Sequence, residues 1–320
     1  YANAEQDGYV QRGDIDLGNV DDEVGRLQVR FDPSDEFTLD LSATFTNTKS
    51  NGDARVLYEY LYNDSAGPGR HFSAVSQLLV DVGEAPLVEN DPRIISNGYD
   101  APSFCIWDDV NPLTFSPTCE TNLEAEMQVY TANAKWDIND SFSLTSITGH
   151  ITGDQESTND WVWTGAYRRP FVFDYETWSQ ELQLNYDTDR LNAVAGAIFF
   201  NEKGSEREIT HEIRVVGSVP EVATIDDVRA GGSWRRRDGE YQIDTESIGV
   251  FAQATYNLTE KFDVTAGGRM SWDDKDVTII NRPTPQDPDE RTGTGNESWD
   301  NFDWRIAVQY QFTDDFMLYG

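Results

Sequence analysis

The sequence predicts an all-β fold in which antiparallel strands form a transmembrane β-barrel, and three observations support this prediction. Apolar and polar residues alternate over segments of about ten residues, short turns alternate with long loops along the 320-residue chain, and aromatic residues gather beside the short turns. Side chains of a strand point alternately to its two faces, so each such segment has one apolar and one polar face. A tilted transmembrane strand needs about 9 to 11 residues, which matches the length of these segments.

The clearest example is the hairpin at residues 301–320. Every second position from Phe302 to Phe312 is apolar or aromatic, and the positions between them carry Asp, Arg, Ala and Gln. The turn at residues 313–315 reverses the chain, and a return strand begins at Phe316. One apolar face opposite one polar face suits a wall between lipid and a polar lumen. In a soluble β-sandwich the apolar face would point inward, and long and short connections would have no reason to alternate.

The same alternation recurs in order along the chain and predicts ten strands, with residues 1–10 as the end of an eleventh. The strands are expected at residues 26–31, 37–46, 128–136, 142–151, 178–186, 191–200, 248–256, 264–272, 301–312 and 316–319.

Five short turns containing Asp or Asn join these strands in pairs, and an aromatic residue or Leu stands on each side of every turn. Aromatic side chains collect at the interfaces of membrane barrels, where the short turns are periplasmic. We therefore expect a periplasmic girdle made of Phe31, Phe37, Trp136, Phe142, Tyr186, Tyr256, Phe262, Tyr310, Phe312 and Phe316.

The other connections are long and show no sustained period, so they are expected to be extracellular loops. They cover residues 49–122, 154–174, 203–241 and 274–300. The first contains both cysteines, Cys105 and Cys119, which are fourteen residues apart. Their proximity favours a disulfide over two free thiols, in an oxidising compartment.

Charge and composition exclude several functions. The formal net charge of −34 would repel the phosphates of a nucleic acid. No hydrolytic or redox arrangement of residues stands out, so we expect no enzyme activity. His71, His150 and His211 lie far apart and are expected to be ordinary lumen or loop residues. Acidic groups such as residues 273–276 offer carboxylates to Ca²⁺, but solvated loop charge is the favoured interpretation, and no other cofactor is expected.

Several short motifs resemble the barrel of TonB-dependent outer-membrane receptors. They are residues 7–10 and 25–27, the run FDPSDEFTLDLSA at 31–43, TSITG at 145–149, WSQELQL at 178–184, VFAQATYNLT at 250–259, TAGGR at 265–269 and LYG at 318–320. The resemblance implies a 22-stranded barrel in a bacterial outer membrane, surrounded by lipid and lipopolysaccharide, with its loops extracellular. It also implies uptake of a scarce small-molecule ligand, such as a ferric siderophore, cobalamin or a glycan. The energy would come from the TonB–ExbB–ExbD complex of the inner membrane.

Two features of the family have no counterpart in these residues. Family members carry a plug domain and a TonB-binding segment before the barrel, and the strands expected here amount to about half of a family barrel. We therefore expect residues 1–320 to be part of one receptor barrel domain, with the plug domain and the C-terminal strands outside this chain.

Loop aromatic residues beside arginines are the candidate ligand site, because they combine stacking surfaces with cationic anchors for an anionic or aromatic ligand. Packing between loops, or a place in the outer interfacial belt, is the alternative. The candidates are Trp161, Trp163, Tyr167, Arg168 and Arg169 in one loop, and Trp234 with Arg235, Arg236 and Arg237 in another.

Two further functions fit the same strands. A passive porin-like channel would share the barrel but lack the plug, and a surface adhesin or assembly protein would use the long loops to bind cells or an exported polymer. A plug sequence ahead of the barrel would favour the transporter over the channel.

Overall fold

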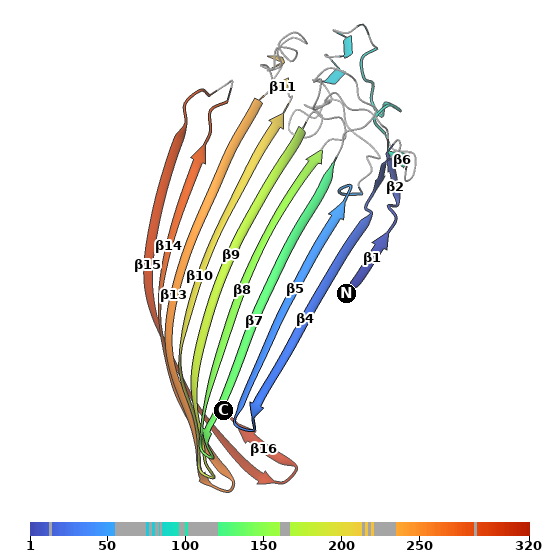
Figure 1. Cartoon of the computed structure of the whole chain (residues 1–320). Coiled ribbons are helices and arrows are strands. Elements are labelled where there is room, and N and C mark those ends of the chain that lie inside the picture. The colour runs from blue at the N-terminus through green and yellow to red at the C-terminus, as the bar shows by residue number, and fades with distance from the viewer. Residues whose placement is uncertain are drawn as a thin grey trace.

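A single antiparallel sheet of 11 strands forms the body of the protein in a computed structural model (Figure 1). The structure describes residues 1–12, 15–54, 75–76, 79–80, 83, 85–95, 100–101, 121–160, 167–212, 215–216, 219–220, 235–284 and 287–320. The strands of this sheet are β1 (Ala2–Gln6), β4 (Val20–Ser34), β5 (Phe37–Ser50), β7 (Asn122–Asn139), β8 (Phe142–Asp160), β9 (Tyr167–Asp187), β10 (Leu191–Glu212), β13 (Arg235–Thr259), β14 (Phe262–Asn281), β15 (Arg291–Thr313) and β16 (Phe316–Tyr319).

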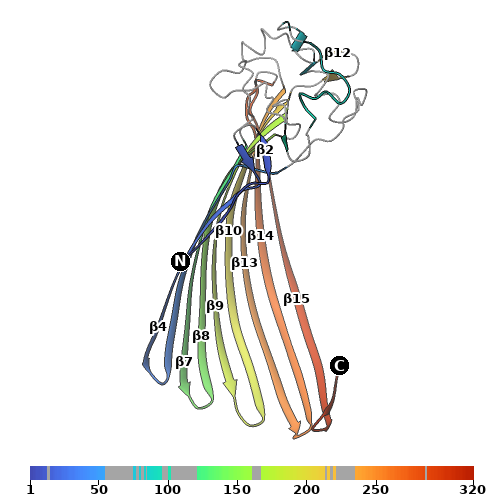
Figure 2. The ribbon, with the colours of Figure 1, turned by 90° about the vertical axis from the view of Figure 1, so that its right-hand side faces the viewer.

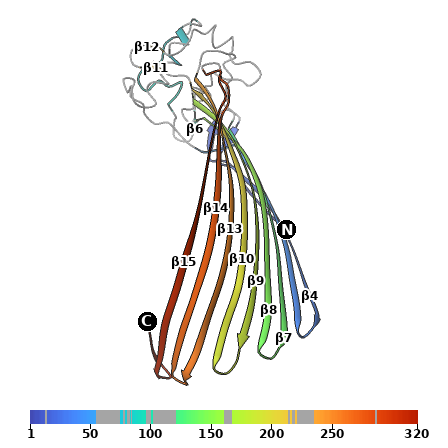
Figure 3. The same cartoon turned by 90° about the vertical axis from the view of Figure 1, so that its left-hand side faces the viewer.

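These strands follow one another across the sheet in chain order, as expected of an up-and-down barrel wall. All the short turns lie at one end, at the bottom of Figure 1, and the long connections lie at the other. Figures 2 and 3 show from two sides that the strands form one continuous layer. The structure therefore confirms the predicted all-β architecture and its alternation of short turns and long connections.

The strands are longer than the alternation predicts, which corrects the expected loop boundaries. β10 continues to Glu212 and β13 begins at Arg235, so both ends of the expected loop at 203–241 are strand. β8 and β9 likewise extend into residues 154–174, and β14 and β15 into residues 274–300. Beyond the lipid both faces of a strand can be polar, so the backbone ladder continues although the apolar period has stopped.

The two faces of the sheet differ in chemistry along the whole wall. Leu27, Leu41, Leu182, Val250 and Ile306 lie on one face, which is apolar over 8 to 11 residues of most strands and is called the outward face here. Its side chains are exposed, as in Trp304 at 70%. The other face carries polar side chains. No helix within the described ranges is long and apolar enough to cross a membrane.

Polar side chains of the inner face bond across neighbouring strands. The hydroxyls of Ser42 and Thr131 are 2.7 Å apart, and those of Thr255 and Thr265 are 2.8 Å apart. Arg30 lies 3.8 Å from Asp40 on the next strand. The inner wall thus satisfies much of its own hydrogen bonding.

Aromatic rings on the outward face form rows at both ends of the apolar band. Near the short turns, the Phe142 ring lies 4.7 Å from that of Tyr186, and the Phe312 ring lies 4.6 Å from that of Tyr310 and 5.4 Å from that of Phe316. These rings belong to the predicted periplasmic girdle.

A second aromatic row crosses the other end of the band and was not predicted. It runs from Phe45 through Tyr130 and His150 to Trp178, with ring separations of 5.8, 6.0 and 5.2 Å. The two rows are eight residues apart on β9, from Trp178 to Tyr186. At about 3.3 Å per residue and a tilt of about 40°, this spacing spans about 20 Å of membrane, close to the apolar height of known membrane barrels.

Small units lie above the sheet, at the end with the long connections. β2 (Val10–Arg12), β3 (Ile15–Leu17) and β6 (Asp100–Ala101) form a three-stranded sheet whose buried core contains Val10 and Leu17. β11 (Val215–Val216) pairs with β12 (Val219–Pro220).

A compact turn at residues 85–95 is organised by one buried carboxylate. Asp91, which is 3% exposed, accepts hydrogen bonds from the backbone N–H groups of Val88 and Arg93 at 3.2 and 2.9 Å. The Arg93 guanidinium bonds the same carboxylate at 2.8 and 3.0 Å and also donates to the carbonyl oxygens of Ala85 and Pro86. The hydrogen bonds from Arg93 lower the pKa of Asp91 to about 2, outweighing the opposite effect of burial.

We expect Asp91→Asn to loosen this turn, because the amide loses the ion pair with Arg93. A carboxylate with a lowered pKa stabilises the fold above its ordinary pKa, and this contribution of about 2 kcal/mol disappears as the pH falls from about 4 to about 2. Limited proteolysis between β5 and β7 should therefore be faster for Asp91→Asn at pH 7. The exposed neighbour variant Glu89→Gln serves as the control, and equal cleavage rates for the two variants would contradict the expectation.

Candidate ligand site

A pocket of about 610 Å³ lies at the long-connection ends of β10, β13, β14 and β15. Most of its lining continues the polar inner face, because Glu208, Arg237, Asn281 and Arg291 stand at inward positions of their strands. The full lining is Glu208, Thr210, Arg237, Asp238, Gly239, Tyr241, Asn281, Arg282, Thr284, Asp287 and Arg291.

Ion pairs hold the arginines around the pocket. Arg207 donates two bonds of 3.0 Å to Asp238, which is 5% exposed. Arg291 contacts Asp287 at 2.6 Å. In two further ion pairs, Arg169 donates to Glu208 and Arg282 donates to Glu240.

The pKa values of the carboxyl groups show how these pairs are charged. Burial raises the pKa of Glu208, but hydrogen bonds from Arg169 and Thr210 outweigh it, and the pKa lies below its ordinary value. The hydrogen bond from Arg282 lowers the pKa of Glu240. Both carboxyl groups stay ionised at neutral pH, so each neutralises one guanidinium.

Arg237 is the one arginine of this described group that is not paired with a carboxylate. It is exposed and makes no ion pair within the described part of the chain. Among the side chains that the structure describes, the group around the pocket contains five arginines and four carboxylates, and the excess charge is that of Arg237. The chain as a whole has a net charge of −34. Tyr241, which is 44% exposed, lies on the same face of β13, and Gly239 between them adds no side chain. A cation and a free aromatic ring therefore face the pocket together.

A family match decides the identity of this wall. Residues 91–320 match the family described as "TonB dependent receptor-like, beta-barrel". The chain belongs to the TonB-dependent receptor family. Its strands are accordingly those of a transmembrane barrel in the outer membrane, with the apolar outward face toward lipid and the pocket at the extracellular end.

Three solved structures show the same fold in other members of this class. The ferric yersiniabactin uptake receptor FyuA from Yersinia pestis is 16% identical with a TM-score of 0.63, and the match covers 99% of this chain and 40% of FyuA. The siderophore receptor PiuA from Acinetobacter baumannii is 15% identical with a TM-score of 0.57, and the match covers 99% of this chain and 43% of PiuA. The ferric-catecholate import receptor Fiu from E. coli K12, in its open form, is 13% identical with a TM-score of 0.54, and the match covers 99% of this chain and 48% of Fiu. No curated protein matches the chain.

The barrel register of the receptor brings together the two predicted arginine segments. The end of β10 lies between them, with His211 opposite Arg168 on one side and Arg236 on the other. Glu212 is likewise opposite both Tyr167 and Arg235. Arg169 joins the pocket group through its pair with Glu208. Segments more than sixty residues apart in the sequence thus meet across one strand.

Other predicted residues lie outside the described residues. These are Trp161, Trp163, Trp234, Cys105 and Cys119, and the side chains of Tyr167, Arg168, Arg235 and Arg236. The ligand-binding role of the first segment and the disulfide therefore stay predictions.

Sequence reasoning named Arg237 but missed the rest of the pocket lining, including Tyr241, Asn281, Arg282 and Arg291. Arg282 and Arg291 flank the acidic, proline-rich connection at 283–290, and basic residues at both ends of an acidic segment are a signal that could have been used. The acidic run at 273–276 is not a loop, since it lies within β14, where Asp273 faces inward and Asp274 and Asp276 face outward. The described residues contain no cluster of three or more metal-ligating side chains.

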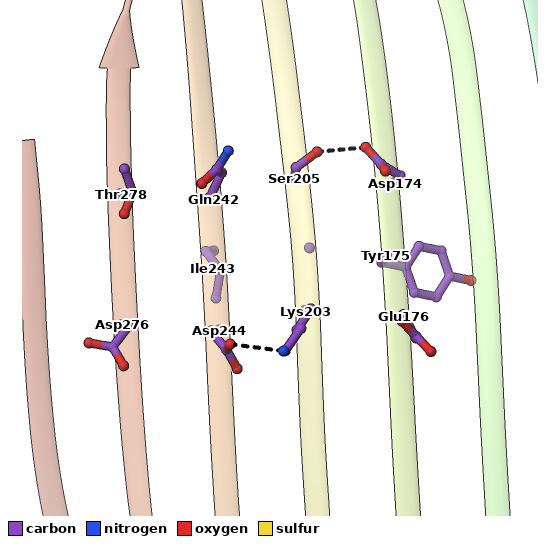
Figure 4. Close-up of a pocket in the computed structure, with 11 residues that line it drawn as sticks. Asp174, Tyr175, Glu176, Lys203, Ser205, Gln242, Ile243, Asp244, Asp276 and Thr278 are labelled. Atoms are coloured by element: carbon purple, nitrogen blue, oxygen red, sulfur yellow. Dashed lines mark hydrogen bonds and ion pairs between the residues drawn. The ribbon is translucent and has the colours of Figure 1, made fainter. Parts of the chain in front are cut away.

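A second hollow, of about 400 Å³, lies on the outward face of the receptor just beyond the apolar band (Figure 4). Four of its five charged side chains are acidic. Lys203 lies 3.5 Å from Asp244, and Ser205 donates to Asp174 at 2.6 Å. Glu176 and Asp276 add further negative charge (Figure 4). This hollow would repel an anion, so the inner pocket is the better candidate for an anionic ligand.

Proposed function

We propose that this chain is part of a receptor that actively imports a scarce anionic ligand, most simply a ferric siderophore, through the outer membrane. The observation that carries the proposal is the inner-face pocket, where Arg237 and Tyr241 offer an unpaired charge and a stacking surface to a ligand arriving from outside the cell. Family membership and the siderophore receptors among the structural neighbours support it.

The partners follow from the family. The energy would come from the TonB–ExbB–ExbD complex acting through a plug domain, and lipid and lipopolysaccharide would surround the barrel. No catalytic step and no resident cofactor is proposed, and Ca²⁺ in the acidic loops stays a prediction. Because the chain spans 40% to 48% of the length of the three neighbours, these partners belong to the proposal for the whole receptor.

Competition binding to the full-length receptor tests the ligand class. Unlabelled ferric siderophores, cobalamin and oligosaccharides would each compete with one labelled ferric siderophore for binding to the receptor. We expect Arg237→Gln to weaken binding of an anionic ferric siderophore by about tenfold or more, because a charge-assisted hydrogen bond is lost. Lys203→Gln removes the same charge from the outward face and should leave affinity unchanged. Equal affinity of the two variants would refute the assignment of the pocket.

Uptake measurements separate active transport from passive diffusion. Cells expressing the receptor should accumulate the labelled ferric ligand, and an uncoupler that collapses the inner-membrane proton gradient should stop accumulation. Uptake that is insensitive to the uncoupler would instead indicate a porin-like channel.

A further inference from the structure

The apolar band of the receptor has one polar interruption. Apart from tyrosine and tryptophan rings and Gln128 at its extracellular edge, the polar side chains at outward positions of the band are Ser146, Thr148 and His150 on β8 and Gln180 on β9. In the register, Thr148 is directly opposite Gln180, and His150 is opposite Trp178. Polar groups facing hydrocarbon cost free energy, so their presence within a lipid-facing band indicates a function. This placement also corrects the expectation that His150 is an ordinary lumen or loop residue.

Thr148 and Gln180 use their donors within the protein. The Thr148 hydroxyl donates to Gln180 Oε1 at 2.7 Å. Gln180 Nε2 donates to Ser146 Oγ at 3.0 Å and to the Glu181 carbonyl oxygen at 3.1 Å, which occupies both amide hydrogens. The hydroxyl oxygen of Thr148 keeps its lone pairs, so it can accept a hydrogen bond from outside the protein.

His150 borders this group and is held by polar contacts on both ring nitrogens. Its Nδ1 lies 3.1 Å from the Thr177 carbonyl oxygen, which can only accept, so Nδ1 carries the hydrogen. Its Nε2 lies 3.8 Å from Glu176 Oε1 and so faces a carboxylate of the same outward face. The ring is held between Tyr130 at 6.0 Å and Trp178 at 5.2 Å, within the extracellular aromatic row.

An apolar groove of about 510 Å³ lies directly below this aromatic row. The small side chains of Ala43, Ala132 and Thr148 occupy three neighbouring strands and leave the hollow, and larger side chains border it. No charged residue is among its lining, which is Leu27, Val29, Leu41, Ser42, Ala43, Tyr130, Thr131, Ala132, Thr148, His150 and Trp178.

The position of the groove indicates what fills it. It is continuous with the lipid-facing band, and it borders the extracellular row, so the molecules that reach it are lipids of the outer leaflet. An uncharged lining fits an acyl chain and not a headgroup. Above the groove the outward side chains are acidic, as in Asp154 and Glu176. Carboxylates accept hydrogen bonds from sugar hydroxyls but repel phosphate.

We propose that this groove binds the acyl chain of an outer-leaflet glycolipid, and that a hydroxyl group on the chain donates to Thr148 Oγ1. The acceptor at the groove distinguishes a hydroxylated chain from a plain one, because only the former brings a donor. The site is independent of the ligand pocket, since it lies on the opposite face of the wall.

Native mass spectrometry of the detergent-solubilised full-length receptor tests this. The probes are galactosylceramide with a 2-hydroxyacyl chain and the same lipid without the hydroxyl. We expect one hydroxylated lipid to be retained per receptor, with a preference of about tenfold over the plain lipid, the size of one hydrogen bond. Equal retention of both lipids would overturn the proposal.

Three variants locate the site. Ala132→Phe fills the floor of the groove and should abolish retention of both lipids, whereas Ala197→Phe, at an outward alanine of β10 outside the groove, should leave retention unchanged. Thr148→Val keeps the shape and should reduce the preference for the hydroxylated lipid. Heat-dependent gel mobility confirms that each variant is folded. If Ala132→Phe converts a dimer to a monomer without affecting lipid, the groove contacts a second copy and the proposal fails.

Discussion

The substitution Ala252→Arg should destabilise the receptor by about 2–4 kcal/mol, because it places a charge near the middle of the lipid-facing band. Ala252 lies on the outward face of β13, four residues from each end of the apolar segment between Ile248 and Tyr256. Its outward neighbours across the sheet are Ala195 and Gly268, so no acidic side chain is at hand to pair with the guanidinium. Equilibrium unfolding of the full-length receptor in liposomes measures the loss.

The adjacent residue provides the control. Gln253 faces inward on the same strand, so Gln253→Arg adds the same charge to the polar wall and should cost much less. A larger loss for Gln253→Arg than for Ala252→Arg would mean that the two faces of the wall are assigned the wrong way round.

A side chain at Gly196 should also be strongly destabilising. A Cβ atom at this position would lie 2.6 Å from the Leu182 carbonyl oxygen and 2.6 Å from Cζ of Phe251, whose ring lies over the glycine on the inner face. The carbonyl oxygen belongs to the neighbouring strand and cannot move without distorting the ladder. We expect Gly196→Ala to cost about 1–3 kcal/mol and Gly196→Val to prevent assembly into the membrane.

Two comparisons make this expectation specific. Gly25→Ala is the control, because nothing lies within 4 Å of a Cβ atom at Gly25. Adding Phe251→Ala to Gly196→Ala removes the contact with the ring but leaves the contact with the backbone, so the pair should restore only part of the lost stability. If Gly196→Ala unfolds at the same denaturant concentration as Gly25→Ala, the predicted clash of the Cβ atom at position 196 is wrong.

The alternation of apolar residues predicted the part of each strand that lies in lipid and little beyond it. Residues 191–200 alternate because one face meets hydrocarbon, whereas residues 202–208 are Glu-Lys-Gly-Ser-Glu-Arg-Glu and carry no period, although they continue β10. A strand with water on both faces needs no apolar face, so its sequence need not alternate between apolar and polar residues. The length of the strands outside the membrane could therefore not be predicted from the sequence.

The ligand pocket depends on register, which the sequence does not state. Arg169 was recognised from its aromatic and basic neighbours, but its partner Glu208 is 39 residues away and became visible only when β9 was aligned with β10. Gln180 and His150 were hidden for a different reason. A polar residue in an alternating strand is assigned to the lumen by default, and only the strand pairing shows that these two stand on the lipid side.

The extension of the strands beyond the membrane determines how far from the cell a ligand is first held. Glu208 follows Phe199, the last outward residue of the apolar band on β10, by nine positions. This is about 30 Å along the strand at about 3.3 Å per residue, or about 23 Å of height at a tilt of about 40°. The pocket thus stands above the apolar band by a height similar to that of the band itself. A ligand bound there as proposed would not yet have begun to cross the bilayer. Recognition and translocation would then be separate steps in space, and substitutions at the pocket would change the first without affecting the second.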